Sequence, residues 1–344
     1  MTKDKLTHIV KCVVPDSNND IDAWQLVLSQ HGVTPSIFHL YNTVRYYVSY
    51  FARNESINLS LVVYDNSQPV GVFPLMAHKN DSNNWILSSN GVEIVECIFI
   101  PTLARKVKKR LESKLVELIH LLSSELNIDF VQFANMKYGR LSSWYLKWIG
   151  EASKTFSTYH LLVDLSLSLE DIRLKFRKSY KPLINKALRE WRVDVHENVS
   201  EEVFDQFRLL HKEVAGRSTR PIESWNEQKH QIDSSESFLV TVSNDKCQMV
   251  GAGLFTFSDY QGIYCVGAYK RDLFDKPLGH VVQMKAIETL KNRGVVWYEI
   301  GRKYLKIDNE PATDKELSIS HFKEGFSTQV IARQHLIVNM QSDA

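Results

Sequence analysis

A strand, a glycine-containing loop, a helix and a second strand follow one another between residues 262 and 301, and this succession constrains the fold most. The runs GIYCVGAY (262–269) and VVWYEIG (295–301) have strand character. Between them, LFDKPLGHVVQMKAIETLKNRG (273–294) begins as a loop and continues with the apolar spacing of a helix. Such a unit predicts an α/β fold, and it is a common way to bind a phosphate.

The two halves of the chain repeat one order of elements. In the first half, helices (22–31 and 36–52) precede a strand–turn–strand run (60–79), a long amphipathic helix (103–127) and a buried strand (128–135). In the second half, helices (168–191 and 200–216) precede three strands (237–269), the helix after the loop and the strand 295–301. This repetition predicts an internal duplication into two domains, residues 1–155 and 156–344.

Length and composition are those of a globular protein of two domains. The 344 residues are 44% hydrophobic and 24% charged, and the net charge of +2 argues against a dedicated DNA binder. Four cysteines far apart, without a CxxC pair, predict reduced thiols in a cytoplasmic protein. No apolar run approaches the ~20 residues of a membrane span, and no pattern matches a metal site, a Walker loop or a catalytic triad.

The loop before the helix has the properties of an anion site. The first amides of a helix lack intrahelical partners, and the helix dipole favours negative charge at that end. Gly279 permits close approach of an anion to the backbone, and Lys270, Arg271 and Lys276 add positive charge. The residues alone leave a second interpretation open, in which Pro277 and Gly279 only shape the turn of a strand–helix–strand crossover.

Four stretches carry a resemblance to a known family. They are VVYDNSQPVGVFPLMAHK (62–79), RKSYKPLINKALREW (177–191), LGHVVQMKAIETLKNRGVVWYEIG (278–301) and ISHFKEGFS (319–327). Their order resembles the GNAT acyltransferase fold, and the tandem arrangement resembles the Fem peptidyltransferases, whose FK-x-GF ending the last stretch matches. The resemblance implies an α/β (α+β) fold of two tandem GNAT-like domains, each a mixed, mostly antiparallel sheet flanked by helices.

The resemblance also implies that acyl-CoA is the co-substrate, that the second domain binds it, and that no metal takes part. In GNAT enzymes the pantetheine lies along the strand before the phosphate loop, which implies backbone contacts from Cys265, Val266, Gly267 and Ala268. Binding of the pyrophosphate is then implied for the loop and helix start: Lys276, Leu278, Gly279, His280 and Val281. His280 departs from the family pattern, in which a second small residue is usual.

Three side chains are candidates for the proton transfers of an N-acyl transfer. An amine with a pKa of about 8 is appreciably neutral at pH 7, so a strong general base is not essential. Glu299 on the strand 295–301 is the candidate base, His280 opens the helix, and Tyr304 is a candidate to protonate a leaving thiolate. Each also has a structural interpretation, as a paired carboxylate or a half-buried ring.

The segment HKEVAGRSTRPIESW (211–225) is the candidate acceptor site. Arg217 and Arg220 flank a turn, and two guanidinium groups can hold a diphosphate through bidentate bonds. Trp225 or Tyr269 can stack on a base or a sugar face. The segment therefore fits a dTDP- or UDP-linked amino sugar, and the alternative is a polar surface loop with Trp225 in the core.

Three classes of function remain open. The first is an acyl-CoA-dependent N-acyltransferase that acts on a nucleotide-linked amino sugar in surface polysaccharide synthesis. The second is a Fem-type peptidyltransferase that uses aminoacyl-tRNA on a cell-wall precursor, which a basic run within 173–192 would suit. The third is a non-catalytic binding module. The sequence has no extended heptad insertion like the coiled-coil arm of many Fem enzymes, which favours the first class.

Overall fold

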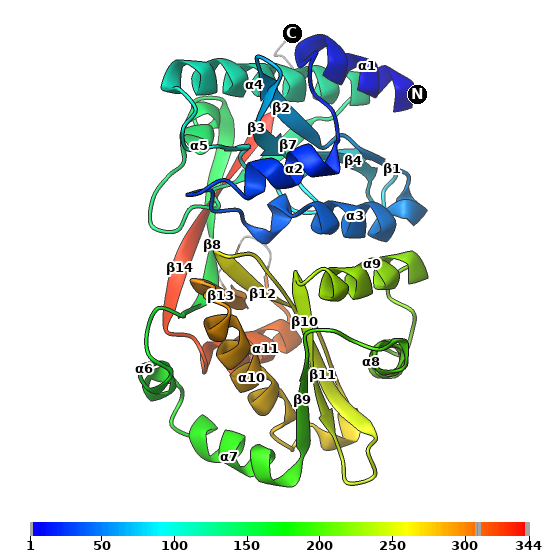
Figure 1. Ribbon diagram of the computed structural model, residues 1–344, viewed down its shortest axis with the longest axis vertical. Helices are drawn as coiled ribbons and strands as arrows, with labels where there is room; N and C mark the ends of the chain where they lie inside the picture. Colours follow the sequence, from blue (N-terminus) through cyan, green and yellow to red (C-terminus); the bar gives the residue numbers. More distant parts are fainter. Residues whose placement is uncertain (1–2, 307, 309–310, 341–344) are drawn as a thin grey trace. The chain divides into compact units, whose positions relative to one another are not determined.

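The computed structural model describes residues 3–306, 308 and 311–340, and these divide into two compact units (Figure 1). The first unit is Met1–Ser157 together with Arg333–Ala344, and the second is Thr158–Ala332. The expected boundary after residue 155 lies close to the one found after Ser157. The final segment groups with the first unit instead of the second, because the end of β14 (Gln329–Asn339) pairs with β7 (Phe130–Ala134). The outer ends of the expected domains, residues 1 and 344, lie outside the described residues.

Six neighbouring strands form the sheet of the second unit, in the order β8-β13-β12-β11-β10-β9. They are β8 (Ala152–Asp164, entering from the first unit), β9 (Arg192–His196), β10 (Ser237–Ser243), β11 (Met249–Phe257), β12 (Gln261–Tyr269) and β13 (Trp297–Lys303). All neighbours run antiparallel except β12 and β13, which are parallel. A parallel pair needs a crossover, which α10 (Leu278–Asn292) supplies.

Helices cover both faces of this sheet (Figure 1). One face packs against α6 (Leu169–Lys175), α7 (Tyr180–Glu190) and α10, in a core that includes Val240. The other packs against α8 (Glu201–Ala215) and α9 (Ile222–Asp233), in a core that includes Leu239. Neighbouring residues of β10 thus enter different cores, which is the period of two that a strand buried on both sides requires.

The segment 168–191 was expected to be one helix and forms two. The first, α6, ends at Lys175, and α7 begins at Tyr180. Proline in a continuous helix lacks the amide hydrogen and clashes with the carbonyl four residues earlier, whereas the first turn tolerates it. Pro182 lies in the first turn of α7, so the break places the proline where a helix accepts it.

The first unit builds its main core along α4 (Arg105–Leu126). The apolar stripe expected on this helix is buried: Leu111, Leu115, Leu118, Leu122 and Leu126. Its remaining helices are α1 (Lys3–Val13), α2 (Ile21–Leu28), α3 (Tyr41–Tyr50) and α5 (Ser143–Trp148). Within the described residues, every helix is too short or too polar to cross a lipid bilayer.

The strands of the first unit lie in two small sheets, apart from β7, which with β14 forms the end of the eight-stranded sheet. The sheets have the orders β1-β4-β5 and β2-β3-β6, and β7 pairs with β14. The strands are β1 (Ser56–Asn58), β2 (Leu61–Asp65), β3 (Gln68–Phe73), β4 (Met76–Lys79), β5 (Trp85–Ser88) and β6 (Ile98–Phe99). Asn66 and Ser67, with φ of 48° and 63°, form the turn expected between the first two strands of the run 60–79.

Candidate active site

The parallel strands β12 and β13 diverge after a short paired segment. Their register joins Gln261–Ile263 to Trp297–Glu299. Beyond Ile263, β12 remains paired with β11 as far as Tyr269, and within the described residues no strand pairs with its other edge. The edge of a strand presents unpaired backbone donors and acceptors, so an extended ligand can add to it as a further strand.

A β-bulge lies at the start of this open edge. In the register between β11 and β12, Leu254 opposes Val266 and Phe255 opposes Tyr264, which leaves Cys265 as the extra residue. A bulge turns local backbone groups away from the ladder, and bulges are common beside active sites. The four residues expected to contact pantetheine, Cys265 to Ala268, therefore follow the point where the sheet opens.

The side chains of these four residues alternate in exposure. Val266 and Ala268 are buried in the core under α8 and α9, whereas Cys265 and Gly267 are exposed. A Cβ on Gly267 would lie 1.8 Å from the hydroxyl oxygen of Tyr264, so only glycine leaves room for that ring. The Tyr264 hydroxyl lies 3.0 Å from the hydroxyl of Tyr269. Gly267 therefore makes room for the paired hydroxyls of Tyr264 and Tyr269 beside this edge.

Glu299 is the centre of a buried polar network at the divergence. Its Oε1 lies 2.6 Å from Nδ1 of His160 on β8, and its Oε2 accepts a hydrogen bond of 2.9 Å from Nε2 of Gln261. The Oγ1 of Thr158 lies 2.8 Å from Nε2 of the same imidazole. A carboxylate can only accept, so Nδ1 of His160 carries a proton. Three adjacent strands thus orient the carboxylate that the sequence analysis selected as a base.

A partly buried lysine faces the same place from α11 (Asp314–Glu324). Lys323 belongs to the FK-x-GF stretch, and its Nζ lies 5.3 Å from the ring centroid of Tyr264. A Cβ on Gly301 would lie 2.6 Å from this Nζ, and the φ of 152° at Gly301 also favours glycine. Burial lowers the pKa of Lys323, and the charge of Glu299 opposes that shift. Lys323 gives up its proton more easily than an exposed lysine.

Sequence reasoning missed His160 and Lys323 as site residues. His160 lies 139 positions before Glu299 in the chain, and only the pairing of β8 with β13 brings them together. No local pattern could have indicated that contact. For Lys323 a signal was present, because the stretch that contains it had been singled out by the family resemblance.

The start of α10 retains free backbone donors. The amides of His280 and Val281 donate to the carbonyl of Pro277, whereas those of Leu278 and Gly279 make no hydrogen bond among the described residues. Lys276 is exposed just before the helix, where it pairs with Asp275 at 2.7 Å. Two free amides at a helix N-terminus beside an exposed cation can bind a phosphate oxygen.

An aromatic cluster closes one side of this helix start. A Cβ on Gly279 would lie 3.1 Å from Cζ of Phe322, so close packing also requires glycine here. The ring of His280 lies between those of Tyr180 and Phe322, with centroid distances of 4.5 Å and 5.0 Å. Burial, and to a lesser extent the charge of Arg177, lowers the pKa of His280 to about 4, so its imidazole is neutral at pH 7.

The two remaining tyrosines have packing contacts. Tyr304 follows β13, its amide donates to Oγ of Ser320, and the guanidinium carbon of Arg302 lies 4.8 Å from its ring centroid. Tyr269 ends β12, and its ring lies over Gly251, where a Cβ would be 2.9 Å away. Burial raises the pKa of Tyr269 well above its usual range, so its phenol stays protonated.

Arg217, Arg220 and Trp225, three of the four expected acceptor residues, line a small basic cavity of about 60 Å³, whereas Tyr269 is not part of its wall. Its walls include Arg208, Lys212, Arg217 and Arg220. The guanidinium carbon of Arg220 lies 3.7 Å from the ring centroid of Trp225, and both side chains are buried, whereas Arg217 is exposed. A cavity of this size and charge suits one phosphate group rather than a base, and the buried Trp225 packs against Arg220 and the core.

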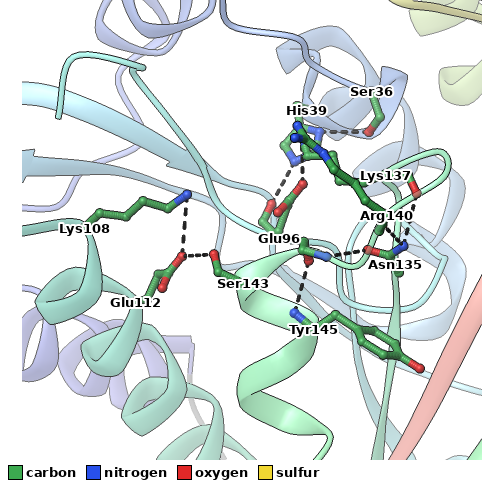
Figure 2. A network of polar contacts seen from close by, with 11 residues as sticks. Ser36, His39, Glu96, Lys108, Glu112, Asn135, Lys137, Arg140, Ser143 and Tyr145 are labelled. Atoms are coloured by element: carbon green, nitrogen blue, oxygen red, sulfur yellow. Dashed lines mark hydrogen bonds and ion pairs between the residues drawn. The ribbon is translucent and has the colours of Figure 1, made fainter. Parts of the chain in front are cut away.

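A second buried polar network lies in the first unit (Figure 2). His39 Nε2 donates to the carbonyl of Glu96 at 2.9 Å, and its Nδ1 lies 2.8 Å from Oγ of Ser36. Lys137 pairs with the Glu96 carboxylate at 3.1 Å. Burial lowers the pKa of His39 to about 4. This network ties separate segments together around a neutral imidazole, which is a structural role.

In the part of the chain that the structure describes, no three His, Cys, Asp or Glu side chains could jointly hold a metal ion.

Comparison with known proteins identifies the fold. No family model matches the sequence, and no curated protein matches it either. Among solved structures, FemX is similar with a TM-score of 0.61 and 14% identity, covering 98% of this chain and 96% of that one. L-PGS from Bacillus licheniformis is similar with a TM-score of 0.59 and 11% identity, covering 94% and 93%. The chain has a GNAT/Fem-like fold, which confirms the fold class expected from the sequence.

Proposed function

We propose that this chain is an N-acyltransferase that moves an acyl group from acyl-CoA to the amino group of a dTDP- or UDP-linked amino sugar. One observation carries the proposal: β12 and β13 diverge beside the buried carboxylate of Glu299, and the open edge of β12 begins at a bulge. A thioester with an extended arm fits such an edge. An ordered carboxylate next to it can take the proton of an attacking amine.

The donor side follows from the open edge and the start of α10. The backbone of Cys265–Ala268 offers the groups for a strand-like pantetheine, and the free amides of Leu278 and Gly279 offer two donors for a pyrophosphate. Lys276 adds a positive charge that is exposed. We assign this donor site to the second domain, as the residues from 156 onwards were expected to provide it.

The chemical step joins the amine nitrogen to the acyl carbon and breaks the carbon–sulfur bond. Glu299 receives the amine proton, with His160 and Gln261 holding the carboxylate in place. A backbone amide at the Cys265 bulge binds the oxyanion of the tetrahedral intermediate. Lys323, whose pKa is lowered by burial, returns a proton to the leaving thiolate. Glu299 ends the step with one more proton and Lys323 with one fewer, and loss of a proton from Glu299 and uptake of one by Lys323 reset the site for the next turnover.

The acceptor side is proposed for the basic cavity of the second unit. Arg217 and Arg220 bind one phosphate of the nucleotide, and Arg208 and Lys212 add to the positive field. Trp225 supports the guanidinium of Arg220 from below rather than stacking on a base. Both substrates are made in the cytoplasm, where we propose that the reaction serves surface polysaccharide synthesis.

A second candidate is a Fem-type transferase that uses aminoacyl-tRNA on a cell-wall precursor. Exposed cations on α6, on α7 and in the segment between them favour it: Lys175, Lys178, Lys186 and Arg189. A row of exposed cations can neutralise RNA phosphates. In both candidates an amine attacks an activated carbonyl at the same opening, and they differ in the leaving group. Assaying acyl-CoA and charged tRNA as donors on one protein preparation separates the two.

A further inference from the structure

A cavity of about 630 Å³ lies in the first unit, between β5 and β7. Beyond the end of β5, the amide of Ile94 donates to the carbonyl of Gln132 on β7 at 2.8 Å, and residues of both strands line the cavity. On their far edges, β5 pairs with β4 and β7 pairs with β14. The volume lies within the roughly 300–1,000 Å³ of ligand pockets.

The cavity wall is rich in amide side chains and holds no lysine or arginine. Four of its amides make no side-chain hydrogen bond among the described residues: Asn83, Asn84, Asn127 and Gln132. An amide offers two donors and an acceptor, which is the complement of a hydroxyl group that both donates and accepts. A wall with two carboxylates, Glu93 and Asp129, and without lysine or arginine does not suit a phosphate or another anion.

A buried imidazole adds a polar atom to this wall. His78 is 7% exposed, and its Nδ1 lies 3.3 Å from Oγ of Ser88. Its ring stacks on Phe51 with a centroid distance of 4.1 Å. Within the described residues, its Nε2 makes no hydrogen bond. This nitrogen can therefore exchange a hydrogen bond with a ligand hydroxyl in the cavity.

Two exposed apolar side chains complete the wall. Phe130 is 51% exposed and Ile86 is 36% exposed, and both line the cavity. The ring of Trp85 is less available, because Nζ of Lys79 lies 5.3 Å from its centroid. A sugar ring presents hydroxyl groups around its edge and C–H groups on its faces. Amides beside an exposed aromatic ring match both of these surfaces.

We infer that this cavity binds a neutral sugar unit of a glycan, one or two rings long. The site is separate from the groups assigned to acyl transfer, and the inference does not depend on that assignment. It gives the first unit a binding function of its own, in which uncharged hydroxyl groups are recognised by amides and by Phe130.

Calorimetric titration of the full chain with maltose and with N,N′-diacetylchitobiose tests the inference. We expect saturable binding of at least one disaccharide at millimolar concentration. The double variant Asn84→Ala/Gln132→Ala should weaken it about tenfold, since it removes two hydrogen-bonding groups. Phe130→Ser should weaken it independently, through lost stacking. Asn226→Ala, an exposed amide on α9, is the matched control and should leave the affinity unchanged.

Three results would overturn the inference. The first is no binding of either disaccharide to the folded wild-type chain. The second is binding that the double variant and Phe130→Ser leave unchanged while both variants remain folded by circular dichroism. The third is competition for the cavity by inorganic phosphate or by an unstructured peptide in place of the sugars, which would show that the wall recognises charge or backbone.

Discussion

The Oε1 atom of Glu299 lies 2.6 Å from Nδ1 of His160, and the two residues come from neighbouring antiparallel strands. The other oxygen of the carboxylate is held by Gln261. The carboxylate therefore has a fixed orientation at the point where β12 and β13 diverge. The catalytic role proposed for Glu299 rests on this fixed orientation in addition to its position on the strand 295–301.

Replacing Glu299 by glutamine should reduce kcat by about a hundredfold or more, because an oriented base is lost. The KM values of both substrates should change little. Steady-state kinetics with acyl-CoA and the amino sugar provide the measurement. Glu288→Gln, which alters a partly exposed carboxylate on α10, serves as the control. A fall in kcat below tenfold would mean that the amine attacks without a protein base.

His160 should act through Glu299 and not on its own. His160→Gln is expected to lower kcat and to shift the acidic limb of the pH profile, since the carboxylate loses its partner. The double variant His160→Gln/Glu299→Gln should be no slower than Glu299→Gln alone, because coupled residues are not additive. Additive losses in kcat would assign His160 a separate role.

The contact between Gly279 and Phe322 changes how the donor site should be tested. Gly279→Val places side-chain atoms where a Cβ is already 3.1 Å from the Phe322 ring, and should destabilise the fold by about 1–3 kcal/mol. Phe322→Leu in the same chain should restore much of that loss in urea unfolding. If CoA affinity in the restored double variant equals that of Phe322→Leu alone, Gly279 has a packing role only.

The sequence predicted elements well where one pattern decided the structure. The helix α10 and the three strands within 237–269 were expected and are found, because the apolar pattern of each continues over many residues. At 168–191 the apolar period continued through a proline, and the steric demand of Pro182 prevailed over it. At the end of the chain, local pattern could not reveal that β14 pairs with β7.

Site residues were predictable only where they lie together in the sequence. The edge from Cys265 to Ala268 and the start of α10 are local features of one strand–helix unit, and the structure shows an opening beside them. His160 and the partly buried position of Lys323 depend on contacts between distant segments. Likewise, Arg220 is buried against Trp225 because both lie at the core beneath α8 and α9. The spacing of the arginines in the sequence could not indicate this.

Arg217 should contribute to acceptor binding with little effect on stability, because it is exposed at the basic cavity. Losing one charge-assisted bond costs roughly 1.5–3 kcal/mol, so Arg217→Ala should raise the acceptor KM about ten- to a hundredfold. The acyl-CoA KM should stay nearly constant. Arg192→Ala, an exposed arginine on β9, is the comparison. Equal changes in both KM values would place the acceptor elsewhere.

Acid should destabilise the first unit through His39. Its pKa is about 4 when folded and 6.5 when unfolded, so between these values the unfolded chain binds more protons. Stability is then fully present above pH 6.5 and falls as the pH drops toward 4, by up to about 3 kcal/mol. When the free energy of unfolding is measured with urea between pH 7 and pH 5, it should fall less steeply with decreasing pH in His39→Gln than in the wild-type chain. The same pH dependence of the free energy of unfolding in both proteins would contradict the role proposed for His39.

Product analysis by mass spectrometry tests the central claim most directly. The purified chain would receive acetyl-CoA, dTDP- or UDP-linked amino sugar and, in a parallel reaction, aminoacyl-tRNA with the same acceptor. The account predicts an N-acylated nucleotide sugar from the acetyl-CoA reaction, with free CoA released in equal amount, and product lower by about a hundredfold or more after Glu299→Gln over the same time. Transfer from aminoacyl-tRNA with none from acetyl-CoA would contradict the proposed donor and favour the Fem-type reaction.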